Sequence, residues 1–166
     1  MNLSILQFEQ AGLIDTVMAS LKRHQIPAET LIWEVTETTA MNNPDESVRV
    51  LTALTDAGVK ASIDDFGTGY SSLLYLKRLP ACELKIDRAF VDELSGEGND
   101  ATIVSAIVAL AKTLDLKVVA EGVETETQQT FLTQIGCNTL QGYLLGRPVT
   151  ADVATQLGRE ALAASA

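Results

Sequence analysis

Five short apolar runs alternate with amphipathic helical segments along the chain, and this alternation constrains the fold more than any other feature. The runs have the length and composition of buried strands and cover residues 31–36, 59–64, 84–87, 117–121 and 139–143. Strands that are separated by helices are joined by right-handed crossovers and lie parallel in one sheet. The pattern therefore predicts an α/β fold.

The intervening helices have recognisable ends. Asn43 is a capping residue before a first-turn proline, and Gly58 ends that helix. Thr125 and Gln128 have the spacing of a capping box, and Gly136 ends the helix that they begin. Two further helices are predicted from their apolar faces: about 7–24, with Ile14, Val17, Met18 and Leu21, and one from about Asn99, with Ile103, Ile107, Leu110 and Leu114.

The composition excludes several classes of protein. Twelve Lys and Arg against 22 Asp and Glu give a net charge of −10, which argues against a surface for nucleic acid polymers. No apolar run approaches the ~18 residues of a membrane span, and the first residues lack the regions of a signal peptide. One domain with a full core is expected for 166 residues. Cys82 and Cys137 lack zinc-type spacing and are expected to be buried thiols in a reducing, cytoplasmic compartment.

Polar side chains stand at or near the carboxyl ends of all five predicted strands. They are Glu34, Asp64, Asp65, Lys85, Asp87, Glu121 and Gln141. From Glu34 to Gln141 the strands repeat about every 27 residues, the period of a (β/α) barrel, whose active sites form at this end of the strands. Converging carboxylates repel one another unless a cation compensates them, and hard oxygen ligands favour Mg²⁺, Mn²⁺ or Ca²⁺.

Two adjacent aspartates need a special backbone arrangement to serve one site. The side chains of Asp64 and Asp65 would point to opposite sides of a regular strand. Both can reach the same site only where the strand ends and the chain turns, which is the expectation for this position. The alternative for each polar residue taken singly is a helix N-cap or a solvated loop charge.

Residues 67–72, with the sequence Gly-Thr-Gly-Tyr-Ser-Ser, come close to a dinucleotide-binding fingerprint, because Asp87 follows Gly67 by 20 residues. Ser72 replaces the third glycine, however, and the two aspartates directly before the loop would repel a pyrophosphate. The glycines are interpreted instead as a tight path beside the acidic residues, with Ser71 or Ser72 capping the next helix.

His24, the only histidine, is placed at a helix end, where it complements the helix dipole. The sequence therefore offers no Ser-His-Asp or Cys-His arrangement, which argues against nucleophilic acyl chemistry. The residues alone leave two enzyme classes open. One is metal-dependent phosphodiester hydrolysis, and the other is enolase-like proton abstraction with a lysine base.

Several segments resemble the EAL-domain family of cyclic di-GMP phosphodiesterases. They are NLSILQF, LIWEVTET, ASIDDFGTGYSSLLYLKRLPACELKIDRAFV, KVVAEGVET and LQGYLLGRPV, in the family's order and spacing from Asn2 to about Val153. The resemblance implies a TIM-like barrel that binds cyclic di-GMP and hydrolyses it to pGpG. It also implies one or two divalent cations, Mg²⁺ or Mn²⁺, as cofactors.

The resemblance assigns roles to individual residues. Metal binding is implied for Asn2, Glu34, Asp64, Asp65 and Glu121, and catalytic roles for Glu121, Lys85 and Asp65. Lys85 matches the lysine that positions the attacking water, and Glu121 matches a carboxylate of metal binding or general-base work. Supporting roles are implied for Asp87, Gln141, Glu37, Glu124, Gly67, Thr68 and Gly69, with Glu37 ordering the glycine loop.

One part of the family pattern is absent. The namesake Glu-Ala-Leu segment, with its metal-binding glutamate and a nearby arginine, would precede Asn2. The sequence Glu160-Ala161-Leu162 lies in a helical tail and cannot replace it. Because a TIM barrel needs ~250 residues, the expected fold is a partial TIM-like (β/α)8 barrel lacking about its first two strands. Residues 1–153 would form the EAL domain and residues 154–166 an Ala-rich helix or tail.

A gap in the barrel would expose strand edges, which proteins cover by pairing or association. The chain is therefore expected to form a homo-oligomer or to be completed by another polypeptide. Two functions follow from the resemblance. One is a cyclic di-GMP phosphodiesterase, and the other is a non-catalytic module that binds cyclic di-GMP or a protein.

Overall fold

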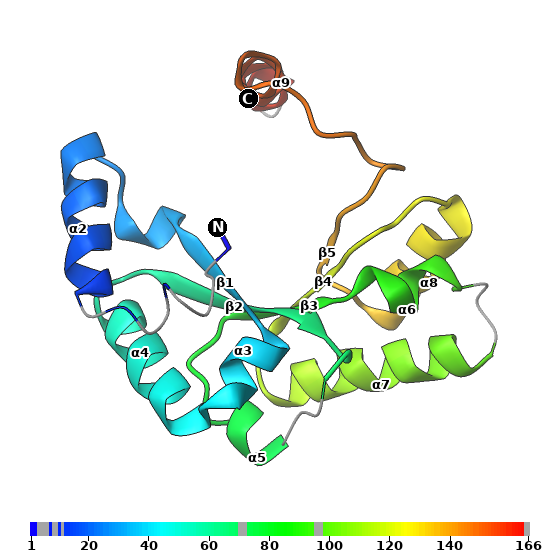
Figure 1. Ribbon diagram of the computed structural model, residues 1–166. Helices are drawn as coiled ribbons and strands as arrows, with labels where there is room; N and C mark the ends of the chain where they lie inside the picture. The colour runs from blue at the N-terminus through cyan, green and yellow to red at the C-terminus, as the bar shows by residue number, and fades with distance from the viewer. Residues whose placement is uncertain (3–6, 8–9, 11, 70–72, 95–97, 165–166) are drawn as a thin grey trace.

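A parallel sheet organises the chain. The computed structural model describes residues 1–2, 7, 10, 12–69, 73–94 and 98–164, and within them the sheet has five strands in sequence order (Figure 1). These strands are β1 (Ile32–Thr36), β2 (Lys60–Phe66), β3 (Glu83–Ile86), β4 (Lys117–Ala120) and β5 (Thr139–Leu140). Neighbouring strands in sequence order are the product of successive βα units, as in a barrel. The predicted α/β class is confirmed.

Helices connect the strands and cover the sheet. Before β1 lie α2 (Leu13–His24) and the short 3₁₀ helix η1 (Ala28–Thr30); the others are α3 (Glu37–Asn42), α4 (Pro44–Asp56), α5 (Leu73–Leu76), α6 (Arg88–Asp92), α7 (Asn99–Thr113), α8 (Glu126–Ile135) and α9 (Ala151–Ala164). Helix α4 packs against β2, and α7 packs against β3 and β4. Both lie on the same side of the sheet in Figure 1.

The helix ends follow the predicted signals. Asn43 accepts a hydrogen bond from the backbone N–H of Glu46, and Gly58 has a positive φ just beyond α4. Thr125 and Gln128 form the reciprocal capping box of α8, and Gly136 ends that helix in the left-handed conformation. His24 is the last residue of α2, as expected. The predicted capping by Ser71 or Ser72 concerns residues outside those that the structure describes.

One strand departs from regular alternation. From Ile63 to Phe66 the chain advances three residues, whereas the partner strand advances only from Leu84 to Ile86. Strand β2 therefore contains one extra residue, a β-bulge, and Asp65 takes a left-handed φ of 53°. The expectation that β2 ends at the aspartates is wrong, because the strand continues through them to Phe66.

The core lies between the sheet and the helices, and it corrects two predictions. Ile103 is 41 % exposed, because α7 turns Val104, Val108 and their neighbours toward β3 and β4 instead. Cys82 and Cys137 are free thiols, as expected, but they are only partly buried. Cys82 directly precedes β3, and Cys137 lies two residues before β5.

Beyond Leu140 the chain leaves the sheet earlier than predicted. Strand β5 has two residues, because the chain then turns to bond the loop after β4: the Val123 N–H donates to Gln141 O and the Leu144 N–H to Val123 O. Helix α9 follows an extended segment and stands apart in Figure 1, with no buried residue. It begins at Ala151, so the predicted domain limit at 153 falls inside it and stays a prediction. The described residues include no helix long and apolar enough to span a membrane.

Candidate active site

Lys85 lies at the centre of three carboxylates. Its Nζ is 2.7 Å from Glu121 Oε1, 3.0 Å from Asp64 Oδ1 and 3.3 Å from Glu34 Oε1. The four side chains come from the middle of β1, from the carboxyl-terminal parts of β2 and β3, and from the residue after β4. Parallel strands bring these ends to one edge of the sheet, where barrel enzymes carry their sites. The predicted convergence is thus present for Glu34, Asp64, Lys85 and Glu121.

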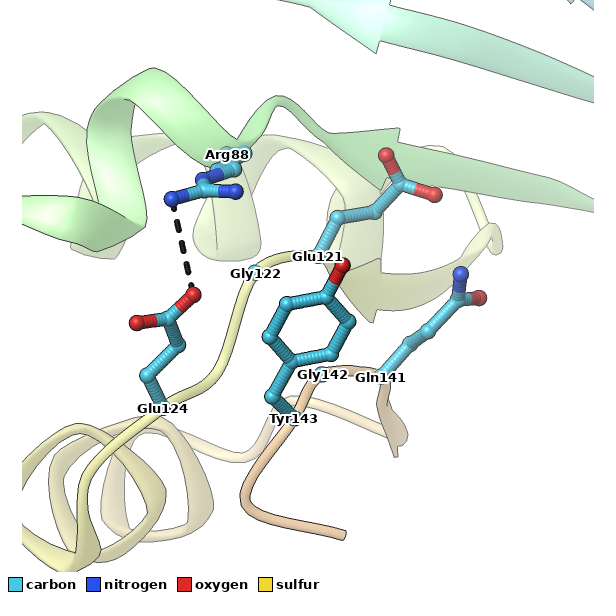
Figure 2. Close-up of a pocket in the computed structure, with 7 residues that line it drawn as sticks. All are labelled: Arg88, Glu121, Gly122, Glu124, Gln141, Gly142 and Tyr143. Carbon is cyan, nitrogen blue, oxygen red and sulfur yellow. Dashed lines mark ion pairs between the residues drawn. The ribbon is translucent and has the colours of Figure 1, made fainter. Parts of the chain in front are cut away.

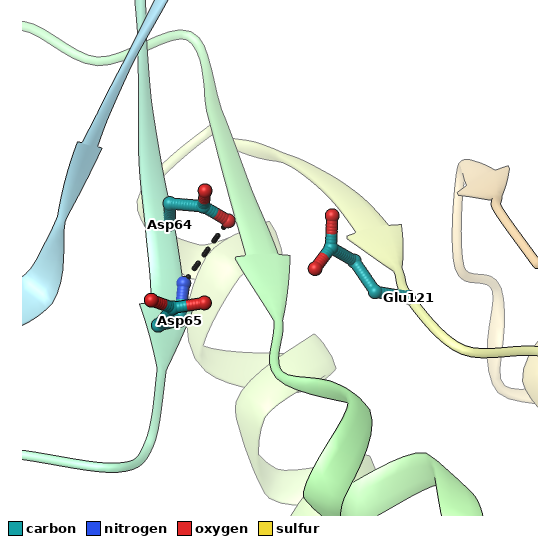
Figure 3. Close-up of side chains that lie close together, drawn as sticks. All are labelled: Asp64, Asp65 and Glu121. Carbon is teal, nitrogen blue, oxygen red and sulfur yellow. Dashed lines mark hydrogen bonds between the residues drawn. The ribbon is translucent and has the colours of Figure 1, made fainter. Parts of the chain in front are cut away.

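The bulge in β2 turns both aspartates to the same region. Carboxylate oxygens of Asp64, Asp65 and Glu121 all lie within 4.8 Å of one another, a grouping that could hold a metal ion (Figure 3). Two residues, Asp64 and Asp65, take the place that a regular strand gives to one, so alternation no longer separates them. The Asp65 N–H also donates to Asp64 Oδ1 at 3.1 Å, which fixes the pair locally.

Lys85 compensates the negative charges of Asp64 and Glu121 more closely than that of Asp65. Burial raises the pKa of Asp65, and the neighbouring charges of Asp64, Asp87 and Glu121 raise it further. Lys85 does not reverse that shift, because it pairs with Asp64 and Glu121 instead. Asp65 therefore adds a negative charge that the described side chains leave without a close cation, as expected of a site that receives one.

Lys85 is held as an ammonium ion. Burial alone lowers the pKa of its amine, but hydrogen bonds to Glu121 and Asp64 and the charges of these groups raise the pKa well above its usual range. The side chain is 8 % exposed, so little solvent weakens these pairs. Lys85 can donate hydrogen bonds and supply positive charge here, but it cannot accept a proton.

Asn2 and Glu37 flank the cluster in different ways. Asn2 pairs with Glu34 through a parallel β-bridge beside β1, so the backbone places it at the same strand end. Glu37, fully buried at the start of α3, accepts a hydrogen bond of 2.7 Å from the Gly67 N–H. A side chain at Gly69 would meet Glu37 Oε1, so the glycine loop closes onto this carboxylate. Thr68 anchors the loop from the other side through its hydroxyl, which donates to Asp65 O.

A pocket of about 180 Å³ lies beside Glu121 (Figure 2). Its described lining comprises Arg88, Glu121, Gly122, Glu124, Gln141, Gly142 and Tyr143. Glu124 does not join the carboxylate cluster, since it pairs with Arg88 at 3.4 Å. Gln141 lines the pocket on the same side as Glu121 in Figure 2. Asp87 accepts a hydrogen bond from the Ala89 N–H and caps α6, and its charge also acts on Asp65.

Four of these lining residues are not among the candidates that the sequence pattern indicates. Arg88 directly follows Asp87, and Tyr143 lies two positions after Gln141. Their closeness in sequence to these two candidate site residues is the signal that could have identified them. Gly122 has a φ of 74°, and a Cβ there would collide with the Arg88 side chain. Gly142 lies so close to the Val123 backbone that no Cβ fits. The alternative of a Rossmann-type cofactor fingerprint at this loop finds no support, because Gly67 and Thr68 bond to Glu37 and to the Asp65 carbonyl.

A family model described as EAL domain matches residues 1–148. The chain belongs to the EAL domain family. Among curated relatives, this EAL domain is 64 % identical to the bifunctional diguanylate cyclase/cyclic di-GMP phosphodiesterase MucR of Pseudomonas aeruginosa over 151 residues, 91 % of this chain and 22 % of MucR. It is 48 % identical to the cyclic di-GMP phosphodiesterase NbdA of the same species, across 84 % of this chain and 18 % of NbdA. The chain thus spans about a fifth of such relatives.

Solved structures place the fold of this EAL domain. The PaMucR phosphodiesterase in complex with c-di-GMP superposes with a TM-score of 0.89 at 63 % identity, over 92 % of this chain and 62 % of that one. The EAL domain of Mycobacterium smegmatis DcpA gives 0.88 at 40 % identity, over 94 % and 70 %. Klebsiella pneumoniae BlrP1, with manganese and cyclic di-GMP, gives 0.82 at 35 % identity, over 89 % and 38 %. The five described strands and their connecting helices therefore form a partial TIM-like barrel.

Proposed function

We propose that this EAL domain hydrolyses cyclic di-GMP to the linear dinucleotide pGpG in a cation-dependent reaction. The supporting observation is the arrangement of Lys85 among Glu34, Asp64 and Glu121, with Asp65 brought beside them by the bulge. Relatives named as cyclic di-GMP phosphodiesterases, and a relative solved with manganese and cyclic di-GMP, support the choice of substrate.

The donor set fits a hard divalent cation. Asp64, Asp65 and Glu121 supply carboxylate oxygens within one ion's reach, and burial together with the charges of the neighbouring carboxylates raises the pKa of Asp65. We propose Mg²⁺ or Mn²⁺, held by these three residues, with Glu34 and Asn2 beside them at the end of β1. A bound cation would neutralise charge on the phosphodiester and lower the pKa of the water that attacks it.

The protein side chains have separate tasks in this reaction. The oxygen of the water forms a bond to one phosphorus, one P–O bond of the ring breaks, and the leaving ribose oxygen takes up a proton, so that water is the only other reactant. Lys85, held as an ammonium ion, donates to the water or to a phosphate oxygen and stabilises the developing charge. Glu121 is placed to accept the proton from the water, since its carboxylate faces both Lys85 and the aspartates.

The enolase-like alternative loses support from the same geometry. That reaction requires a neutral lysine as base, whereas Lys85 forms ion pairs with three carboxylates. Asp87, Glu124 and the glycine-loop residues Gly67, Thr68 and Gly69 are proposed to support the site rather than to react. Gln141 is proposed as a substrate contact, because it lines the pocket beside Glu121.

A second function is a non-catalytic module that binds cyclic di-GMP or a protein. The observation that favours it is an open sheet edge: among the described residues, β1 pairs on its outer side through the Asn2–Glu34 bridge alone. Such an edge can add a strand from another polypeptide. We propose that a second copy or a completing polypeptide covers it. A cytoplasmic location is also proposed, since both cysteines are free thiols.

The test is hydrolysis of cyclic di-GMP by the purified chain with Mn²⁺, followed by chromatography of pGpG. Glu121→Gln is expected to abolish turnover, whereas Glu126→Gln, an exposed change in the first turn of α8, is expected to preserve it. Binding of cyclic di-GMP without turnover would support the module instead. A chain that neither binds nor hydrolyses the compound would overturn both functions.

A further inference from the structure

Gln128 connects two segments that are distant in sequence. It is 4 % exposed, and its Oε1 accepts hydrogen bonds from the backbone N–H groups of Glu124 at 2.8 Å and Thr125 at 2.9 Å. Its Nε2 donates to the carbonyl oxygens of Val91 at 2.9 Å and Asp92 at 3.4 Å. The capping box accounts for the Thr125 bond only. The bonds to Val91 and Asp92 tie α8 to the end of α6.

The two segments that Gln128 joins carry the two counter-ions of one arginine. Arg88 Nε lies 3.0 Å from Asp92 Oδ2 and 3.1 Å from Asp92 Oδ1, and Arg88 Nη2 lies 3.4 Å from Glu124 Oε1. One partner is thus on α6 and the other on the loop before α8. A shift between these segments would separate the carboxylates that hold the guanidinium. Gln128 therefore links the two backbone segments that carry these carboxylates.

Arg88 in turn forms a wall of the pocket beside Glu121. It is the cation among the described residues that line this pocket, and its pair with Glu124 is drawn in Figure 2. Its aliphatic stem lies directly over Gly122, where a Cβ would not fit. Gly122 follows Glu121, so the same loop carries both the reacting carboxylate and the floor under Arg88. The guanidinium is more than half exposed and can meet a ligand in the pocket.

We propose that Gln128 is a positioning residue for substrate binding: it sets the Arg88–Glu124 wall against which the non-reacting part of a bound nucleotide lies. This inference rests on the proposed function, because that function supplies the nucleotide. Gln128 acts on binding rather than on bond breaking. It contacts none of the carboxylates of the Lys85 cluster, and its bonds end at the wall.

Two substitutions distinguish the role of the Gln128 amide oxygen from the role of its amide nitrogen. Gln128→Glu keeps an acceptor for the Glu124 and Thr125 N–H groups but places an oxygen against the Val91 carbonyl. Gln128→Met removes both halves at similar length. Both variants are expected to raise KM for cyclic di-GMP about 5- to 10-fold, the size of one lost hydrogen bond, with kcat within about two-fold. The matched control is Gln134→Glu, the same change at an exposed position of α8.

A double-mutant cycle identifies the route of the effect. If Gln128 acts through Arg88, Gln128→Glu combined with Arg88→Lys raises KM no more than the larger single change. If Gln128 supports the fold in general, the two effects multiply. Multiplying effects, or a fall in kcat with unchanged KM, would overturn the proposal.

Hydrogen exchange supplies a readout that needs no turnover. The Glu124 and Thr125 amides are expected to exchange at least about 10-fold faster in Gln128→Met, because they lose their acceptor, and at the original rate in Gln128→Glu and Gln134→Glu. Unchanged exchange in Gln128→Met would overturn the positioning role. If the unaltered chain does not hydrolyse cyclic di-GMP, the proposed function fails, and the exchange rates alone decide whether Gln128 orders this wall.

Discussion

The carboxylate of Glu37 and the backbone N–H of Gly67 are joined by a 2.7 Å hydrogen bond across 30 residues of sequence. The bond links the end of β1 to the loop after β2, and it is made by a fully buried side chain. It therefore couples the two strands that carry Glu34 and the aspartate pair. Movement of the glycine loop requires this bond to break.

Glu37→Ala is expected to lower the free energy of unfolding by ~1–3 kcal/mol, because the Gly67 N–H loses its buried acceptor. Glu37→Gln keeps an oxygen at the same reach and is expected to retain most of the stability. Urea denaturation of both variants checks this. Equal losses in the two variants would show that the charge, and not the acceptor, matters.

Lys85→Met is expected to destabilise the cation-free chain by ~1–3 kcal/mol, because it leaves Asp64, which is buried, and two partly buried carboxylates without their counter-charge. Mn²⁺ is expected to restore part of this loss by replacing the charge. Lys77→Met, at an exposed position, is the control and should change little. Thermal unfolding with and without Mn²⁺ measures the effect. A Lys85 variant as stable as the control would contradict the central role of this ion pair.

Asp65→Asn is expected to stabilise the chain in the absence of cations. Burial and the charges of Asp64, Asp87 and Glu121 raise the pKa of Asp65, so its ionised form opposes folding at neutral pH. Asparagine tolerates the left-handed φ, so the change isolates the charge. A rise in Tm is expected for this variant, together with a smaller stabilisation by Mn²⁺ than in the unaltered chain.

The direction of the Asp65 pKa shift also determines how the stability of the chain depends on pH. The folded chain binds this proton more tightly than the unfolded chain, so lowering the pH through the folded-state pKa stabilises the unaltered protein relative to the Asp65→Asn variant. The stability difference between the two should therefore shrink below neutral pH. A difference that grows on acidification would contradict the assignment.

Gly142→Ala is expected to be strongly destabilising, by ~2–4 kcal/mol, because a Cβ there would overlap the Val123 backbone. Gly146→Ala makes the same change where a Cβ meets open space, and it should be nearly neutral. Chemical denaturation compares the two. A tolerated Gly142→Ala would mean that the loop after β4 can move away without loss.

The two thiols are expected to react slowly with an aromatic disulfide reagent at pH 8. Burial raises the pKa of both Cys82 and Cys137, so the reactive thiolate is scarcer than in the unfolded chain. Folded cysteines keep their protons at a pH where unfolded ones, with pKa near ~8.5, lose them. Stability should therefore fall as the pH rises above that value. Equal labelling rates in folded and denatured protein would contradict this.

The sequence predicts the features of this fold that depend on neighbouring residues. The cap at Asn43, the box of Thr125 and Gln128 and the end at Gly136 use groups within four positions of one another, so a local pattern identifies them. The order of the strands follows from alternation with helices, and with it the meeting of Glu34, Lys85 and Glu121 at one edge.

The features that the sequence missed depend on distant partners. Ile103 fits a helical apolar face, but the sheet position decides which face of α7 is buried. The Arg88 wall needs Asp92, Glu124 and Gln128 together, which only the packing of α6 on α8 provides. The bulge at Asp65 has no signal in β2 alone, since it is defined by counting against the partner strand.

The extra residue in β2, relative to β3, distinguishes the positions that core packing requires from those of the acidic cluster. Phe66 belongs to the core and pairs with Ile86. In a strand without the bulge, residue 65 would pair with Ile86 instead. A β2 shortened by one aspartate would still deliver its phenylalanine to the core, and the sheet would be more regular. The surplus residue has no use for the hydrophobic interior. The length of β2, one residue more than its neighbour requires, is therefore a requirement of the proposed site and not of the core, distinct from the identity of any side chain in it.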